Sequence, residues 1–395
     1  MIETALIFAP DRANNAIFGR PLLERLMMNC ERAGIKKFVI EAAPEARVDL
    51  ARAMGQFSGR NSVSIVESFD DILNHPDGID GAAPCVALAG NLVLSRANLA
   101  QALDGHAANP SLVLKTFSAD RDRGGEIITG PVAQVIKSGL SIDHHTVGIS
   151  VPSETLSLLP FALNGRPEDR DEAELRLAQS LSAETAQKDA PLARWIDRRI
   201  SWRISYRLAR TAITPNMVTI ANTIFGLGAA WMLSVPNYTV RLLATIFFLT
   251  SIMIDGVDGE LARLKMKETK FGGKLDILTD NIVHVAIFVG LLTGCYRASQ
   301  SSAYLALIPI LLTGFAICAY ATWRAFRYRG EEAARWLDTI DRWSGRDFAY
   351  LLVILALFNR LEYFAWGAAF GCYAFAAVLI WLTGQPAKSA DNVSH

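Results

Sequence analysis

Six apolar segments in the second half of the chain constrain its fold more than any other feature of the sequence. Each segment approaches the ~20 residues that a helix needs to cross a bilayer. We place them at residues 217–235, 241–263, 276–295, 303–323, 347–361 and 363–383. The fifth is the shortest, and Arg360 and Glu362 lie beside its end. The pattern predicts an all-α polytopic membrane domain of about six transmembrane helices.

Basic residues are concentrated in three of the segments that flank these spans. The basic segments are residues 194–210, 263–274 and 324–346. The other connections contain only Arg241, Arg297 and Arg360. Loops rich in Lys and Arg stay on the cytoplasmic side of a membrane. With an even number of spans, we expect a multi-pass protein of the inner (cytoplasmic) membrane with both termini in the cytoplasm.

The segment before the first span alternates arginines with aromatic and aliphatic residues. Arginines occupy positions 194, 198, 199, 203, 207 and 210, and Trp, Ile, Tyr and Leu lie between them. A helix of this composition is typical of the membrane interface. An ordinary surface helix is the alternative, but the position directly upstream of a span favours the interface. We therefore predict an interfacial amphipathic helix within residues 191–216.

The first half of the chain alternates short apolar runs with helical periodicity. Strand-like runs occupy residues 4–9, 37–42, 62–66, 84–89 and 111–116, and helical patterns occupy residues 20–34 and 48–54. This alternation predicts an α/β soluble domain with an open, largely parallel sheet. Residues 168–188 are rich in charged residues and alanine, and we expect a solvated helix there that leads into a linker.

The composition agrees with a soluble domain joined to a membrane domain. Hydrophobic residues make up 51% of the chain and charged residues 20%. The 39 acidic residues equal the 39 basic ones, so the net charge does not identify a binding partner. We expect the protein to contact the lipid bilayer and not to bind nucleic acid. The five cysteines show no metal-binding spacing, which predicts reduced thiols and a cytoplasmic soluble domain. The first residues do not resemble a signal peptide.

Two pairs of aspartates stand beside the second and third spans. Asp255 and Asp258 are three residues apart, and Asp276 and Asp280 are four apart. Residues at these spacings share one face of a helix. Two helices that each present two carboxylates near the cytoplasmic side of the membrane can form a single site.

Four carboxylates in a low-dielectric site would repel one another unless cations were bound. Sites rich in carboxylate oxygens suit Mg²⁺ or Mn²⁺. Two such ions could bridge a diphosphate and stabilise both the attacking and the leaving oxygen. The alternative is that these carboxylates pair with nearby lysines, but ionisable groups inside a membrane are costly and usually functional. Gly259 is small enough to let a nucleotide approach, and Arg263 offers a positive charge for a phosphate.

The spacing D-x2-D-G-x2-A-R-x8-G-x3-D-x3-D over residues 255–280 matches the signature of the CDP-alcohol phosphotransferase family at every defined position. The resemblance extends to residues 199–201, 213–219 and 226–230, so it covers about the second half of the chain. It implies that Asp255 and Asp276 contact both metal ions, and that Asp258 and Asp280 contact one each. Asp280 would also be the catalytic base.

The same resemblance implies a binding site for the CDP moiety. Its residues would be Asn216, Met217, Val218, Thr219, Gly259, Arg263 and Thr269. The acceptor hydroxyl would attack the phosphate that carries the alcohol group, and CMP would leave. Arg346 is placed where a basic residue could hold a phosphate on the acceptor, or it is an ordinary interfacial arginine.

The first half of the chain is similar to sugar-phosphate nucleotidyltransferase domains. Residues 5–9 resemble their first strand, and residues 19–26 the start of the next helix. The phosphate loop of active domains is Gly-rich, whereas residues 10–15 contain no glycine. Asn91 stands where active domains have a metal-binding aspartate. We therefore predict an inactive nucleotidyltransferase-like domain over residues 1–190, followed by the interfacial helix and a membrane domain over residues 217–385.

The combination resembles bifunctional inositol-phosphate cytidylyltransferase/di-inositol-phosphate synthase proteins. It predicts transfer of a substituted phosphate from a CDP-alcohol to the hydroxyl group of an acceptor in phospholipid or polar-lipid synthesis. The acceptor molecule either carries a phosphate of its own or does not. CDP-diacylglycerol and a soluble donor such as CDP-inositol both remain open, as does a homodimer. The alternative functions are a transporter or an inactive membrane scaffold. The sequence shows neither the internal repeats of a transporter nor the loss of an aspartate that an inactive scaffold would be expected to show.

Overall fold

The computed structural model describes most of the chain. The described residues are 2–8, 16–47, 50, 61–73, 79–110, 112–117, 126–138, 148–150, 159–163, 166–186, 196–330, 332–333, 336–337 and 348–384. The chain divides into two compact units. The first unit contains residues 1–185 with segments 205–212 and 260–267, and the second contains the remaining residues.

A seven-stranded sheet forms the centre of the first unit. Its strands, in spatial order, are β10 (Gly148–Ser150), β8 (Leu114–Phe117), β9 (Glu126–Pro131), β6 (Pro84–Ala89), β1 (Thr4–Phe8), β4 (Lys37–Glu41) and β5 (Ser62–Val66). Strands β6, β1, β4 and β5 are parallel, and β8 is parallel to β10. Only β9 runs antiparallel to its neighbours in the described sheet. The predicted largely parallel sheet is confirmed, and β9 and β10 were not predicted.

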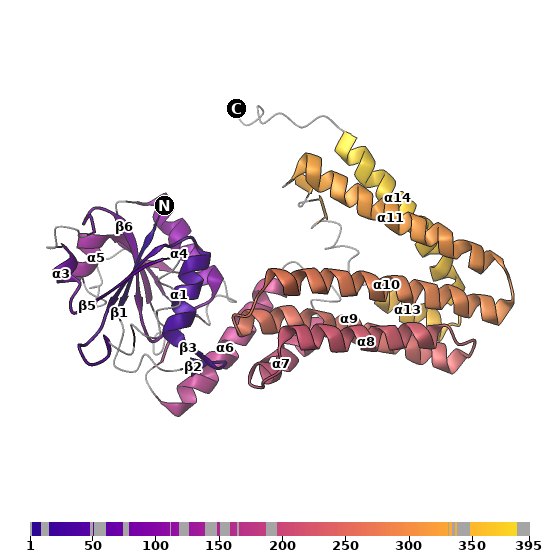
Figure 1. Ribbon diagram of the computed structural model, residues 1–395, viewed down its shortest axis with the longest axis horizontal. Helices are drawn as coiled ribbons and strands as arrows, with labels where there is room; N and C mark the ends of the chain where they lie inside the picture. The colour runs from indigo at the N-terminus through magenta and orange to yellow at the C-terminus, as the bar shows by residue number, and fades with distance from the viewer. Residues whose placement is uncertain are drawn as a thin grey trace. The chain divides into compact units, whose positions relative to one another are not determined.

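Helices cover both faces of this sheet (Figure 1). Along β1, Ala5 and Ile7 pack against α1 (Leu22–Arg32) and α4 (Arg96–Ala108), whereas Leu6 packs on the opposite face with residues of α5 (Val132–Ser138). Successive residues of a strand point to opposite faces, so β1 is apolar at consecutive positions because both of its faces are buried.

Short elements complete the first unit. Strands β2 (Ala16–Ile17) and β3 (Arg20–Pro21) form a hairpin, and β7 (Leu92–Val93) pairs with β11 (Phe161–Ala162). The short helix α3 (Asp70–Leu73) follows β5. The helix predicted at residues 48–54 lies outside the described residues except for Leu50, as does the loop at residues 10–15.

Helix α6 (Pro167–Ala186) corrects one expectation from the sequence, because it is not simply solvated. It buries Ala173, Leu177 and Ala178, and Glu174 is only 1% exposed. The Glu174 carboxylate accepts hydrogen bonds from the Phe18 backbone N–H and from the Arg210 Nε. A charged residue can be buried where its charge and its hydrogen-bonding atoms are satisfied.

The second unit is helical, and the apolar segments of the sequence form its helices. These are α8 (Pro215–Leu233), α9 (Tyr238–Leu264), α10 (Lys270–Ser299), α11 (Ala303–Arg329), α13 (Phe348–Leu357) and α14 (Leu361–Gly384). All but α13 are long and apolar enough to cross a membrane. Many of the large apolar side chains exposed on these helices, such as Trp231 and Trp381, are suited to contact with lipid.

Helix α13 forms at the predicted fifth span but is only ten residues long in the described part of the chain. At 1.5 Å per residue it reaches ~15 Å, about half the hydrocarbon thickness of a bilayer. Asn359 follows with a left-handed φ of 53°. The Arg360 N–H donates back to the Leu355 carbonyl at 2.7 Å, which ends α13 before α14 begins.

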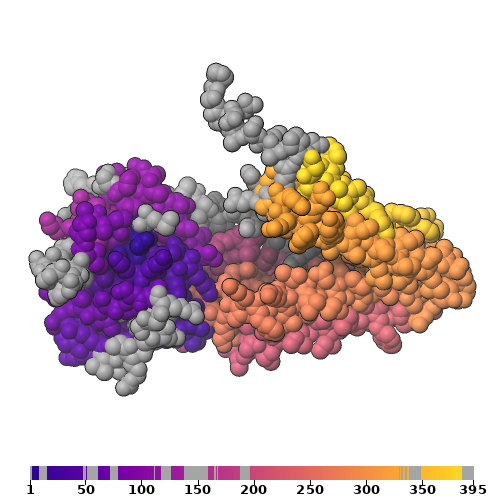
Figure 2. Space-filling model, turned by 45° about the horizontal axis from the view of Figure 1, so that its top comes forward, coloured from indigo at the N-terminus to yellow at the C-terminus, as the bar shows by residue number. Residues whose placement is uncertain are grey.

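Glycines allow the helices of the second unit to approach closely. A Cβ atom on Gly290 of α10 would lie 2.1 Å from the Ala230 carbonyl oxygen of α8, and one on Gly294 would lie 2.1 Å from the Leu233 oxygen. Small residues permit such backbone contact between membrane helices. Helices α11 and α14 lie side by side on the face shown in Figure 2. A Cβ atom on Gly314 of α11 would lie 3.0 Å from the Cβ atom of Cys372 on α14.

The amphipathic segment forms α7 (Arg198–Ala209), and Arg194 and Trp195 lie outside the described residues. Its buried residues are the small Ser201, Ser205 and Ala209, whereas Ile200 is 42% exposed and Ile204 and Leu208 are half-buried. The aliphatic stripe is therefore accessible at Ile200 and partly covered at Ile204 and Leu208. This supports the prediction of an interfacial helix, although its position at a membrane stays a prediction.

Candidate functional site

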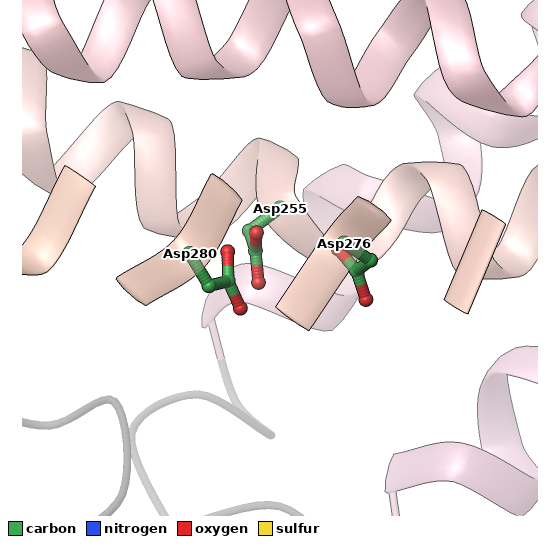
Figure 3. Close-up of side chains that lie close together, drawn as sticks. All are labelled: Asp255, Asp276 and Asp280. Atoms are coloured by element: carbon green, nitrogen blue, oxygen red, sulfur yellow. The ribbon is translucent and has the colours of Figure 1, made fainter. Parts of the chain in front are cut away.

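Three of the four predicted aspartates meet in the second unit. Asp255 lies on α9, and Asp276 and Asp280 lie on α10. Each carboxylate offers an oxygen that lies within 4.8 Å of those of the other two. Figure 3 shows the three carboxyl groups side by side, with Asp255 between Asp280 and Asp276. All three residues are half-buried.

The start of α10 is defined by a capping residue that the sequence analysis singled out. The Thr269 side chain accepts a hydrogen bond from the Gly272 N–H at 2.9 Å, as an N-cap residue does. Asp276 follows Gly272 by one turn, and Asp280 follows one turn later on the same face. The four-residue spacing therefore brings both carboxylates to α9.

Asp258 is held differently from the other three aspartates. It is buried, and its Oδ2 accepts a hydrogen bond from the Thr219 hydroxyl of α8. Its Oδ1 accepts a hydrogen bond from the Gly259 N–H at 2.6 Å. Among the described residues, Asp258 is not part of the group of oxygens within 4.8 Å. The structure therefore gives Thr219 a hydrogen bond to a predicted metal ligand.

The first turn of α8 lies beside the first turn of α10. A Cβ on Gly272 would lie 3.1 Å from the Asn216 Oδ1 and 3.1 Å from the Thr269 Oγ1. Two predicted nucleotide-binding residues, distant in sequence, are thus brought together across a glycine. A larger residue at position 272 would crowd both polar side chains.

The other residues predicted to bind the nucleotide occupy different environments. Met217 is 54% exposed and Val218 is buried. Gly259 is half-buried in α9, and Arg263 is half-buried in the last turn of that helix. Arg263 belongs to the first unit. In that unit burial raises the pKa of Glu184, and the charge of Arg263 lowers it to a smaller extent. Arg346 lies outside the described residues.

His284 is a polar residue at this site that the sequence analysis did not single out. It lies one turn beyond Asp280, and its Nδ1 is 2.7 Å from the Asp280 carbonyl oxygen. The ring is flanked by Phe248 and Phe348 at centroid distances of 6.1 and 5.8 Å. Its position continues the four-residue spacing of Asp276 and Asp280, which is the signal that could have identified it.

The three clustered carboxylates could hold a divalent metal ion. Carboxylates separated by ~5 Å would repel by roughly 3 kcal/mol per pair at an effective dielectric constant of ~20. A cation would remove this repulsion. The donor set contains only oxygen, which fits hard ions such as Mg²⁺ or Mn²⁺ better than thiolate-seeking metals.

Comparisons with known proteins relate the second half of the chain to one enzyme family. Residues 212–384 match a family model described as CDP-alcohol phosphatidyltransferase. The "Bifunctional IPC transferase and DIPP synthase" of Thermococcus kodakarensis is 31% identical over 197 residues, which are 48% of this chain and 43% of that protein. The "Archaetidylinositol phosphate synthase" of Pyrococcus horikoshii is 29% identical over 182 residues, which are 46% of this chain and 85% of that protein.

A solved structure resembles the chain at lower identity. It is a 4-diphosphocytidyl-2C-methyl-D-erythritolsynthase from Anaerococcus prevotii, at 10% identity and a TM-score of 0.34, and the likeness covers 45% of this chain and 98% of that one. The match to the bifunctional relatives spans less than half of their length, 43% in Thermococcus kodakarensis and 35% in Aquifex aeolicus.

Proposed function

We propose that this chain, whose residues 212–384 match the CDP-alcohol phosphatidyltransferase family model, transfers a substituted phosphate group from a CDP-alcohol to an acceptor hydroxyl. CMP is the leaving group. The observation that carries this proposal is the convergence of Asp255, Asp276 and Asp280 within the matched segment. The reaction belongs to phospholipid or polar-lipid synthesis.

The proposed chemistry assigns separate roles to the carboxylates. Asp255, Asp258, Asp276 and Asp280 would hold two Mg²⁺ or Mn²⁺ ions, and such ions would neutralise the diphosphate and stabilise the charge that develops during transfer. Asp280 takes the proton from the acceptor hydroxyl. The hydroxyl oxygen forms a bond to the phosphorus next to the alcohol group, and the bond from that phosphorus to CMP breaks. Thr219 positions Asp258 through the hydrogen bond to its carboxylate.

Residues at the ends of the helices bind the CDP moiety in this proposal. The first turn of α8, Asn216–Thr219, acts with Gly259, Arg263 and Thr269. The proximity of Asn216 and Thr269 to Gly272 supports a shared site for the first two. Gly259 leaves space for the nucleotide, and Arg263 supplies a charge for phosphate.

Two classes of donor satisfy this chemistry: CDP-diacylglycerol and soluble CDP-alcohols such as CDP-inositol. The Pyrococcus horikoshii relative is named as the synthase of an inositol phosphate lipid. Inositol phosphates therefore belong among the acceptors to be tested. A phosphorylated acceptor would suit the basic residues next to the spans, Arg346 among them. A homodimer remains a proposal for the assembly.

The helices and charges support a multi-pass membrane protein. Five helices have the length and composition to cross a bilayer. We place it in the inner (cytoplasmic) membrane, with both termini cytoplasmic, because the basic segments before α8, between α9 and α10, and after α11 would then face the cytoplasm. The α/β domain would share that compartment.

The alternative functions are a transporter and an inactive scaffold. The helices of membrane length in the described part of the chain are continuous, whereas transporters commonly bind substrates at interrupted helices. No observation favours a scaffold over the enzyme. A scaffold would bind a CDP-alcohol without consuming it, so turnover separates the two.

The test is release of CMP by the purified protein from a panel of CDP-alcohols, each with and without an acceptor and Mg²⁺. We expect CMP release that requires Mg²⁺ or Mn²⁺ and stops in excess chelator. An Asp276→Asn variant should be inactive, and Asn237→Asp, outside the site, should serve as a folded control. Turnover in excess chelator would overturn the metal assignment, and no CMP release from any donor would overturn the proposed function.

The α/β domain is proposed to lack nucleotidyl transfer. Asn91 supplies no negative charge, and its Nδ2 donates a hydrogen bond to the Leu163 carbonyl at 3.0 Å. The backbone of the same two residues is also linked, from the Leu163 N–H to the Asn91 carbonyl. Asn91 therefore has a structural role that a carboxylate could not fill.

A further inference from the structure

A basic cavity lies within the first unit. Its volume is about 1000 Å³, and it is lined by residues of the β2–β3 hairpin, α6, the end of α7 and the segment after α9. The cations that line it are Arg20, Arg166, Arg170, Arg210, Lys265 and Lys267. Its described lining does not include Asn91, the residue at the predicted nucleotide site.

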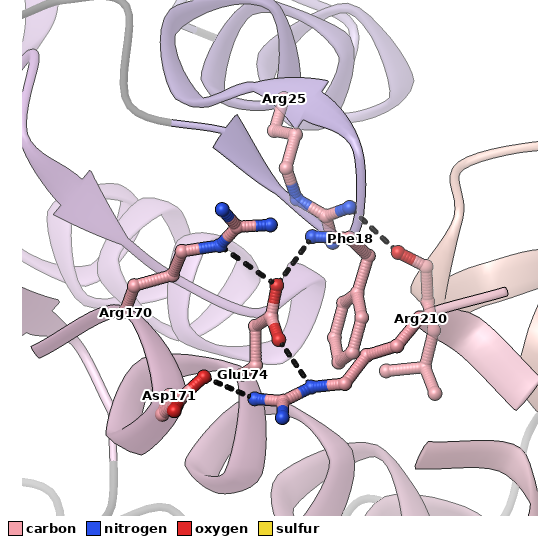
Figure 4. A network of polar contacts seen from close by, with 7 residues as sticks. Phe18, Arg25, Arg170, Asp171, Glu174 and Arg210 are labelled. Carbon is pink, nitrogen blue, oxygen red and sulfur yellow. Dashed lines mark hydrogen bonds and ion pairs between the residues drawn. The ribbon is translucent and has the colours of Figure 1, made fainter. Parts of the chain in front are cut away.

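The acidic residues of this cavity are already neutralised by its own arginines. Glu174 accepts hydrogen bonds from Arg170 and Arg210, and Arg210 also pairs with Asp171, as Figure 4 shows. Glu24 pairs with Arg20. Six cationic side chains line the cavity and only three carboxylates do, so cations are in excess among the lining residues.

The excess charge resides mainly on Arg166 and Lys267. Lys265 is held by a hydrogen bond of 2.6 Å that it donates to the Thr211 carbonyl. Arg166 and Lys267 are exposed, and among the residues that the structure describes neither side chain has an ion-pair partner. The pKa of Lys265 is lowered by burial and, to a smaller extent, by the charge of Lys267, as expected where positive charges are close together.

A further arginine lies beside the cavity. Arg25 is buried and donates a hydrogen bond of 2.6 Å to the Leu264 carbonyl. Burial lowers its pKa to about 10, and the charge of Arg20 contributes in the same direction. The positive potential around this part of the first unit therefore involves more than the side chains that line the cavity.

We propose that this cavity binds a phosphomonoester carried by a small polar molecule or by a lipid headgroup. A phosphomonoester has a charge of about −1.5 to −2 at neutral pH, which the excess positive charge of the cavity would balance. Guanidinium groups match the geometry of phosphate oxygens. The volume exceeds that of a phosphate alone and leaves room for a polyol or headgroup. This inference is independent of the proposed transfer reaction.

The test uses the full chain in phosphatidylcholine nanodiscs, with EDTA present so that divalent metals cannot contribute. Glycerol 3-phosphate is titrated by calorimetry, and glycerol serves as the uncharged comparison. We expect saturable binding of glycerol 3-phosphate alone, weakened about tenfold or more in the double variant Arg166→Gln/Lys267→Gln. Lys36→Gln, which removes an exposed charge elsewhere on the same unit, should bind as the wild type does.

Phosphatidic acid in the nanodiscs distinguishes the two sources of the phosphate. If it displaces glycerol 3-phosphate from the wild type, the cavity accepts a lipid headgroup; unchanged binding identifies a soluble ligand. Equal binding by the wild type and the double variant would overturn the proposal, as would the absence of binding in both kinds of nanodisc. Both substituted side chains are exposed, so the variants should fold, and their melting temperatures check this.

Discussion

The Thr219 hydroxyl of α8 donates a hydrogen bond to the carboxylate of Asp258 on α9. Both residues are buried, and they are separated by 39 positions in the sequence. The bond orients a carboxylate that is proposed to hold a metal ion, much as outer partners orient the ligands of other metal sites. Thr219 thus connects the first turn of α8, proposed to bind the nucleotide, with the aspartates.

We expect Thr219→Val to lower metal affinity and turnover by about 10- to 100-fold, because the isosteric side chain cannot hold Asp258. Thr219→Ser should retain most of the activity. Thr223→Val is the matched control, since the Thr223 hydroxyl donates to the Thr219 carbonyl of its own helix and, within the described part of the chain, to no carboxylate. The measurement is CMP release against Mg²⁺ concentration. Equal metal dependence in Thr219→Val and the wild type would contradict the positioning role.

Asp280 and Asp255 should differ in their effects on donor binding. Asp280→Asn removes the proposed base, so turnover should fall by roughly 10²–10⁴ while much of the donor affinity remains. Asp255→Asn weakens the site for both ions, so donor affinity and turnover should fall together. Calorimetry with the CDP-alcohol and Mg²⁺ provides the comparison. If Asp280→Asn loses donor binding as completely as Asp255→Asn, Asp280 acts chiefly as a ligand.

Gly290→Ala should destabilise the membrane domain. The added Cβ would meet the Ala230 carbonyl oxygen at 2.1 Å, so α8 and α10 would have to move apart. A cost of about 1–3 kcal/mol or more is expected, as for other overpacked cores. Gly228→Ala is the control, because its Cβ would meet nothing within 4 Å. Thermal unfolding in detergent measures both, and equal melting temperatures would show that the close contact is unimportant.

Asn91→Asp should destabilise the α/β domain without giving it nucleotidyl transfer. The substitution removes the donor that bonds the Leu163 carbonyl and places a negative charge beside that oxygen. The expected loss is about 1–2 kcal/mol in the free energy of unfolding. Asn109→Asp, at an exposed position, should be close to neutral. Neither the wild type nor Asn91→Asp should release pyrophosphate from CTP, and release by the wild type would refute the assignment of an inactive domain.

Cys30 should resist alkylation in the folded protein. Burial raises the pKa of its thiol to about 12, so almost no thiolate is present at pH 8. Because the folded pKa lies above the ordinary value of 9.0, the thiol also loses its stabilising contribution as the pH rises above about 9. Mass spectrometry after iodoacetamide treatment tests this. Rapid modification at pH 8 without denaturant would contradict the buried position, whereas the unfolded protein should react readily.

Local spacing in the sequence was enough to predict much of the architecture and of the candidate site. The apolar segments form helices because their length and composition suit only that structure in a membrane, and the strands of the α/β domain follow from short apolar runs. Asp276 and Asp280 share a helix face because they are four residues apart. The family signature at residues 255–280 rests on the same local pattern.

Contacts between distant segments required the tertiary structure. The antiparallel β9, the buried Glu174 on the charged helix α6 and the bond between Thr219 and Asp258 each depend on residues far apart in the chain. Periodicity reports which side of an element is apolar, but not which element packs against it. The sequence by itself determined the apolar helices, five of the seven strands of the described sheet and the aspartate pairs. Only the tertiary structure decided that Asp255 joins Asp276 and Asp280 while Asp258 turns to Thr219, because those contacts depend on how α8, α9 and α10 pack.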